Sequence, residues 1–123
     1  MKLEDWNGEA AAAALDLAAD GLSQLIELSL RRATLTSLPR CFETGTLTAL
    51  EDLDLADCGL DKCEVNSNGL ASCKASLMRL NLSGCKLSAI RLGDLDALRK
   101  LSLNGCKQLT SDSVVLPLSL IHI

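Results

Sequence analysis

The repeating unit of this chain is clearest in the stretch Leu77-Met78-Arg79-Leu80-Asn81-Leu82-Ser83-Gly84-Cys85. Leucine stands at its first, fourth and sixth positions, and cysteine stands at the ninth. The same spacing of leucines begins again at Leu25, Leu50 and Leu98. Successive copies start 25, 27 and 21 residues apart. A short pattern that returns at such intervals indicates a stack of repeated structural units.

The spacing of the leucines within one copy predicts a short strand. Leu80 and Leu82 are two residues apart, so they point to the same side of an extended chain, whereas Arg79 and Asn81 point to the other. One copy cannot bury its leucines alone, and neighbouring copies must supply the contacts. We therefore predict a stack of about four repeats whose short strands pair in parallel with their leucines inward.

The pattern resembles the leucine-rich repeat, L-x-x-L-x-L-x-x-N/C-x-L. The final leucine of that pattern is present as Leu35, Leu60 and Leu87. After Cys106 the chain continues Lys107-Gln108-Leu109-Thr110-Ser111-Asp112, which is similar to the C-x-x-L/I-T-D signature of the cysteine-containing subtype. The resemblance is nearest to the cysteine-containing and ribonuclease-inhibitor-like types. It implies an α/β fold, an open solenoid of about four repeats, with short parallel strands on the concave face and helical or irregular convex returns. It also implies a binding surface for other proteins.

The repeats are predicted to occupy residues 22–117, after an N-terminal segment of residues 1–21. In that segment Asn7 is a plausible helix N-cap, a run of alanines follows, and Gly21 is a plausible stop. We predict a capping helix or a partial repeat there. The alternative is a further full repeat, because residues 15–22 echo residues 53–60.

The last six residues, 118–123, depart from the pattern. A fifth copy would place leucines near positions 119 and 122, where the chain has Ser119 and His122. All six residues match the translation of a transposon-end adapter used in sequencing libraries. We predict a non-native sequencing-adapter tail, with an ordinary apolar tail as the alternative.

Composition excludes several classes of protein. A net charge of −4 disfavours a general nucleic-acid binder, and no apolar run reaches the roughly 18 residues of a membrane span. Three of the six cysteines stand at the ninth repeat position, which favours reduced thiols and a cytoplasmic or nuclear location. A zinc or redox site at Cys58, Cys63 and Cys73, or a disulfide between the last two, is the less favoured alternative.

The sequence contains no recognisable catalytic motif. The single histidine, His122, lies in the suspect tail, so a Ser/His/Asp or Cys/His arrangement is missing. Neither Gly-rich nucleotide-binding motif is present. We therefore predict no enzyme, no catalytic residue, no metal site and no cofactor.

The outward residues of the predicted strands form the candidate binding site. The expected columns across the repeats are Glu27, Asp52, Arg79 and Lys100; Ser29, Asp54, Asn81 and Ser102; and Arg31, Ala56, Ser83 and Asn104. We select Glu27, Ser29, Arg31, Asp52, Asp54, Arg79, Asn81, Lys100, Ser102 and Asn104 as binding residues. The second repeat is acidic and the last two are basic, which favours a partner of matching polarity. The alternative is a set of strand residues that only confer solubility.

These expectations predict a protein–protein interaction module, a fragment of a larger intracellular protein that binds through its concave sheet face. The partner is a protein of unknown identity, not a nucleic acid or a membrane, and further repeats or domains are expected in the full-length chain. Two alternatives are the recognition arm of a truncated enzyme and a ubiquitin-ligase substrate receptor. Both rest on analogy between folds.

Overall fold

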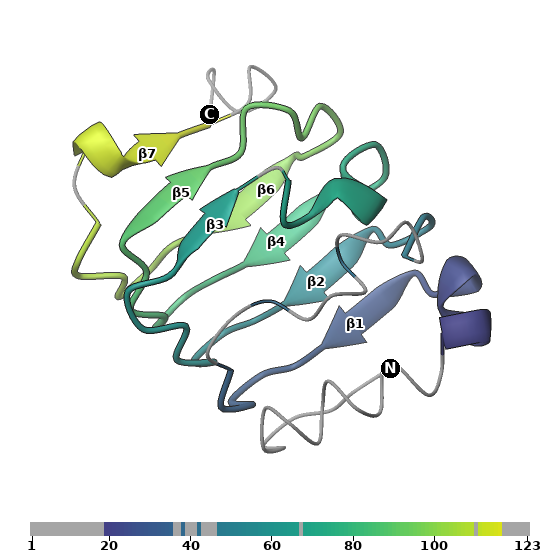
Figure 1. Cartoon of the computed structure of the whole chain (residues 1–123), viewed down its shortest axis with the longest axis horizontal. Helices are drawn as coiled ribbons and strands as arrows, with labels where there is room; N and C mark the ends of the chain where they lie inside the picture. Colours follow the sequence, from purple (N-terminus) through teal and green to yellow (C-terminus); the bar gives the residue numbers. More distant parts are fainter. Residues whose placement is uncertain are drawn as a thin grey trace.

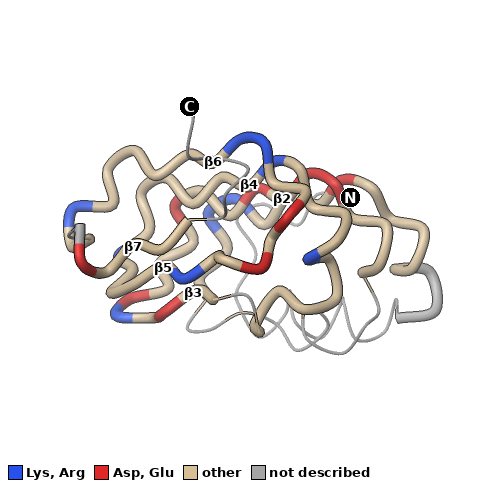
Figure 2. The backbone as a smooth tube through the Cα atoms, turned by 90° about the horizontal axis from the view of Figure 1, so that it is seen from above, with Lys and Arg blue, Asp and Glu red and all other residues tan. Residues whose placement is uncertain are grey.

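The computed structural model describes residues 19–35, 38, 42, 47–66, 68–109 and 111–116. Two parallel sheets form the two layers of the molecule, and the leucine core lies between them (Figure 1; Figure 2). The four-stranded sheet has the order β1 (Glu27–Ser29), β2 (Asp52–Asp54), β4 (Arg79–Asn81) and β6 (Lys100–Ser102). The three-stranded sheet has the order β3 (Glu64–Asn66), β5 (Ala89–Arg91) and β7 (Val114–Val115). The 3-10 turns are η1 (Ala19–Gln24), η3 (Ala71–Cys73) and η4 (Ser111–Ser113).

The four-stranded sheet pairs the same position of each repeat. Leu28 lies opposite Leu53, Leu53 opposite Leu80, and Leu80 opposite Leu101. The register keeps every fourth-position leucine on the inner side, because a slip of one residue would turn them all outward. The predicted fold class, an open solenoid with short parallel strands, is confirmed.

The return segments differ from the expected helical or irregular form, because they carry the second sheet. Its strands also pair in parallel, with Val65 opposite Ile90 and Ile90 opposite Val114. All three inward residues are β-branched, which favours extended backbone over helix. Across this sheet Arg91 Nε lies 3.1 Å from Glu64 Oε1. Among the described residues, helical structure is limited to the 3-10 turns.

The core is continuous through the first three repeats and opens at the fourth. Leu53 is fully buried and Leu80 is 2% exposed, whereas Leu101, at the same position of the last repeat, is only partly buried. Near the end of the described chain, Val115 is 42% exposed and Leu116 is 37% exposed. Among the described residues, the last repeat therefore has less cover than each earlier repeat receives from its successor.

Two predicted segments lie largely outside the described residues. The N-terminal helix is described only from Ala19, where a 3-10 turn passes through Gly21 and ends at Gln24. The tail of residues 118–123 is outside the described ranges altogether. Across the described part of the chain, no helix has the length and apolar character that a membrane span requires.

Candidate functional site: the polar face of the four-stranded sheet

A left-handed residue follows the strand of every repeat, three positions after the last strand residue. The eighth position has positive φ in all four copies: Arg32 at 60°, Asp57 at 57°, Gly84 at 74° and Gly105 at 77°. Only glycine adopts this conformation without steric cost. The turn directs the chain away from the four-stranded sheet towards the return. Our sequence reading missed this turn, although glycine at the eighth position of two copies is a signal for it.

The cysteines at the ninth position form a ladder of thiol hydrogen bonds. Cys58 Sγ donates to the carbonyl of Leu30 at 2.8 Å, and Cys85 Sγ donates to that of Leu55 at 3.0 Å. Cys106 continues the series with a 3.0 Å bond to the carbonyl of Leu82. Each thiol thus bonds the sixth-position leucine of the preceding repeat. The ladder gives the repeat cysteines a structural role.

Burial keeps these thiols protonated. It raises the pKa of Cys58 to about 12, with a smaller effect from the neighbouring Cys85. Burial also raises the pKa of Cys85 and Cys106. The described cysteines form no disulfide with one another, so the alternative disulfide between Cys63 and Cys73 is not formed. Within the described ranges, no three His, Cys, Asp or Glu side chains gather to hold a metal ion.

The sheet register sets out the predicted binding residues in two columns. One column is Glu27, Asp52, Arg79 and Lys100, and the other is Ser29, Asp54, Asn81 and Ser102. These side chains are exposed or partly exposed. We call this surface the polar face of the four-stranded sheet. The repeat spacing predicted both columns because the register pairs equal positions.

The third predicted column is interrupted. Ala56, which lies between Arg31 and Asn104 in that column, is only 1% exposed. Its short side chain is covered, so the second repeat offers no accessible side chain at this position. Arg31, Ser83 and Asn104 are exposed or partly exposed, so the column is interrupted only at the second repeat.

The charges of the polar face are largely paired within the chain. Arg79 Nε lies 3.0 Å from Asp52 Oδ2, and an Arg31 guanidinium nitrogen lies 3.6 Å from Asp54 Oδ2. The predicted division of this face into an acidic second repeat and basic last repeats is therefore weakened, because these ion pairs offset part of the charge on each side. Neighbouring strands lie about 4.8 Å apart, so an arginine reaches the acidic side chain of the adjacent repeat.

Two polar side chains of this face also hold the strand-end turn. Asp54 Oδ1 accepts a 3.0 Å hydrogen bond from the backbone N–H of Ala56. Asn81 Oδ1 accepts the equivalent bond from Ser83 at 3.0 Å. Such local bonds are typical of Asp and Asn at turns. Each residue therefore has a structural role in addition to its predicted place in a binding surface.

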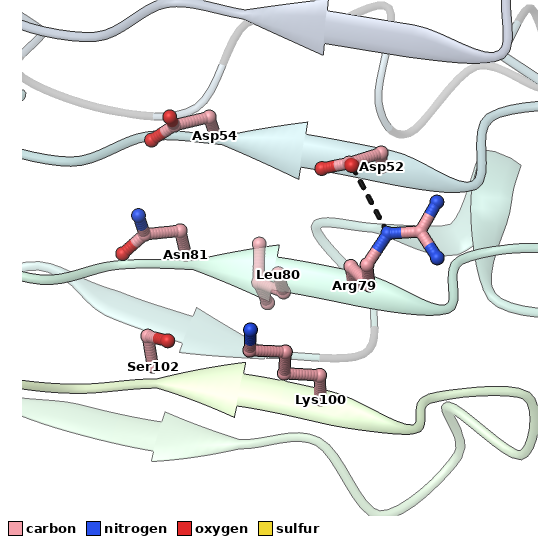
Figure 3. Close-up of a pocket in the computed structure, with 7 residues that line it drawn as sticks. All are labelled: Asp52, Asp54, Arg79, Leu80, Asn81, Lys100 and Ser102. Atoms are coloured by element: carbon pink, nitrogen blue, oxygen red, sulfur yellow. Dashed lines mark hydrogen bonds and ion pairs between the residues drawn. The ribbon is translucent and has the colours of Figure 1, made fainter.

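A hollow of about 180 Å³ lies on the polar face over β2, β4 and β6 (Figure 3). It is lined by Asp52, Asp54, Arg79, Leu80, Asn81, Lys100 and Ser102. Six of these seven residues are among the predicted binding residues. Small-molecule sites usually measure about 300–1,000 Å³. The hollow is therefore better suited to one side chain of a partner than to a cofactor.

Residues 76–96 match the Leucine Rich Repeat family. This match and the solenoid support assignment of the chain to the leucine-rich repeat family. Searches of curated proteins and of solved structures gave no significant match. The matched leucine-rich repeat contains both β4 and β5. A single repeat of this chain thus supplies one strand to each of the two sheets.

Proposed function

We propose that this leucine-rich repeat domain is a protein–protein interaction module that binds through the polar face of its four-stranded sheet. The main support is the register, which joins polar side chains from four repeats into one accessible surface. Repeat solenoids commonly use such extended surfaces for binding. The proposed module has no catalytic activity of its own and requires no cofactor.

We also propose that the module belongs to a longer intracellular protein with further repeats of the cysteine-containing subtype. The partly exposed Leu101 and Leu103 support further repeats in a longer intracellular protein, because a following repeat would cover both. The thiol ladder supports the cysteine-containing subtype. The described cysteines form no disulfide with one another, which is compatible with a cytoplasmic or nuclear location, where cysteines stay reduced.

Site-specific photo-crosslinking in cells tests the proposed surface. A benzophenone amino acid would replace Ser102 on the polar face or, as the control, the exposed Lys74 after η3. We expect mass spectrometry to identify a protein that crosslinks from position 102 and not from position 74. The purified partner should then bind the unlabelled domain directly. Crosslinks from position 74 alone would contradict the proposal.

A further inference from the structure

Lys100 is the cation of the hollow for which the described residues provide no ion-pair partner. Two carboxylates, Asp52 and Asp54, lie near three cations, Arg31, Arg79 and Lys100. The two arginines form the ion pairs with the two carboxylates. Among the described residues, no ion pair or hydrogen bond involves the ammonium group of Lys100. Of these five charged groups, Lys100 is therefore the one without an ion-pair partner in the described part of the chain.

Hydrogen-bond donors accompany this charge. The Ser102 hydroxyl lies on the same strand as Lys100, and both side-chain ends border the hollow (Figure 3). The Asn81 carboxamide uses its oxygen for the strand-end turn, which leaves its N–H groups available to a ligand. Arg99, also exposed, precedes Lys100, and a basic stretch runs beside β6 (Figure 2). The β6 end of the hollow thus offers a cation and neutral donors.

We propose that the hollow binds the carboxylate of an Asp or Glu side chain from a protein partner, with Lys100 as the counter-charge and Ser102 as a hydrogen-bond donor. This inference rests on the proposed function and adds the chemistry of the partner. A carboxylate accepts hydrogen bonds from both groups. A cationic side chain would instead meet the uncompensated Lys100, because both acids already have arginine partners. The small volume suits one side chain.

Labelled glutamate and lysine homopeptides of equal length are suitable probes. Fluorescence polarisation should show tighter binding of the glutamate peptide, which weakens as salt is added. The net charge of −4 repels a glutamate peptide from the protein as a whole. Tighter binding of that peptide would therefore come from a local site such as the hollow. Lys100→Gln should weaken glutamate-peptide binding about two- to fivefold, as for an exposed ion pair. Lys86→Gln, at an exposed position outside both sheets, is the matched control and should not change it.

Charge reversal adds a second measurement. Lys100→Glu should favour the lysine peptide over the glutamate peptide, and its thermal unfolding should remain unchanged because position 100 is exposed. Equal binding of the two peptides by the unsubstituted domain would overturn the proposal. Equal losses in Lys100→Gln and Lys86→Gln would also overturn it.

Binding of the crosslinked partner to the Lys100→Gln variant distinguishes a failure of the carboxylate site from a failure of the proposed function. If the partner binds Lys100→Gln as tightly as the unsubstituted domain, the carboxylate contact is wrong, while the interaction surface stands. If no protein crosslinks from position 102 but glutamate binding still depends on Lys100, the carboxylate preference stands and the proposed interaction surface is wrong.

Discussion

The eighth and ninth positions show how single residues shape each repeat. The eighth residue adopts a left-handed backbone conformation that turns the chain. The ninth residue then places its own side chain in the core in the first three repeats. Gly84 illustrates how tightly neighbouring repeats fit at this point. A Cβ atom added there would collide with the carboxylate of Asp57, the eighth residue of the preceding repeat. At Gly105 the added atom would make only ordinary contacts with Gly84.

Gly84→Ala should therefore destabilise the protein more than Gly105→Ala. Both variants strain a left-handed residue, which costs about 1–2 kcal/mol, and only the first displaces the side chain of Asp57. Chemical denaturation measures both losses in the free energy of unfolding. In an Asp57→Gly background the Gly84→Ala loss should fall to that of Gly105→Ala. An unchanged difference in that background would show that Asp57 is not the cause.

The buried thiol of Cys58 predicts a loss of stability at alkaline pH. Burial raises its pKa from 9.0 to about 12, so above pH 9 the unfolded thiol ionises while the folded thiol keeps its proton. The contribution to stability is complete below about pH 9 and declines as the pH rises towards 12. Denaturation at neutral pH and at about pH 10.5 would measure the change in the free energy of unfolding.

Cys58→Ala provides the reference for that measurement. The two proteins differ only at position 58, so the difference between their alkaline losses isolates the thiol. The variant should be less stable at neutral pH but should lose less stability on the change to alkaline pH. A loss as large as that of the unsubstituted protein would exclude Cys58 as the source.

The strands gain their stability from stacking rather than from length. Each strand of the four-stranded sheet has three residues, and its central leucine packs between those of the neighbouring repeats. Leu53 has such neighbours on both sides, Leu28 and Leu80. Leu101 has Leu80 on one side and is partly exposed. The same residue type at the same repeat position thus has two different environments.

Leu53→Ala should cost about 2–5 kcal/mol of unfolding free energy, as expected for a leucine truncated within a packed core. Leu101→Ala should cost less than this range, because its side chain is already partly exposed. Equilibrium denaturation of the two variants measures the difference. Equal losses would imply that the fourth repeat is covered as fully as the second.

The whole molecule is a stack in which each repeat contacts mainly the next one. Backbone bonds link the repeats in sequence, from the Leu55 N–H to Asn81 at 2.8 Å and from the Leu82 N–H to Ser102 at 2.9 Å. The equivalent N–H of Leu103 has no partner among the described residues. Stability in such a stack is close to a sum over repeats and their interfaces, so the open end should be its weakest part.

Hydrogen exchange should reveal this gradient. The Leu55 and Leu82 amides should be protected, and the Leu103 amide should exchange roughly tenfold faster or more. Exchange followed residue by residue by NMR, under conditions that keep the domain folded, makes the comparison. Equal protection at all three amides would indicate that the solenoid opens only as one cooperative unit.

Much of this architecture could be read from the spacing of a few residues. Leu28, Leu53, Leu80 and Leu101 predicted the strand, its inner face and the register, because extended chains alternate sides and stacked copies align equal positions. The same logic placed Asp52, Arg79 and Lys100 in one column. The spacing likewise assigns Cys58, Cys85 and Cys106 to the ninth position of the repeat, where their thiols bond to the preceding repeat.

Other features depended on contacts between residues far apart in the chain. The second sheet formed because stacking in the first brings successive returns together, and the three short strands β3, β5 and β7 leave little periodic signal in sequence. Likewise, the sequence marked Asp52 and Arg79 as charges, but only the distance between adjacent strands showed that they neutralise each other. Lys100 emerged as the uncompensated cation for the same reason, since charge pairing is a property of distances in space.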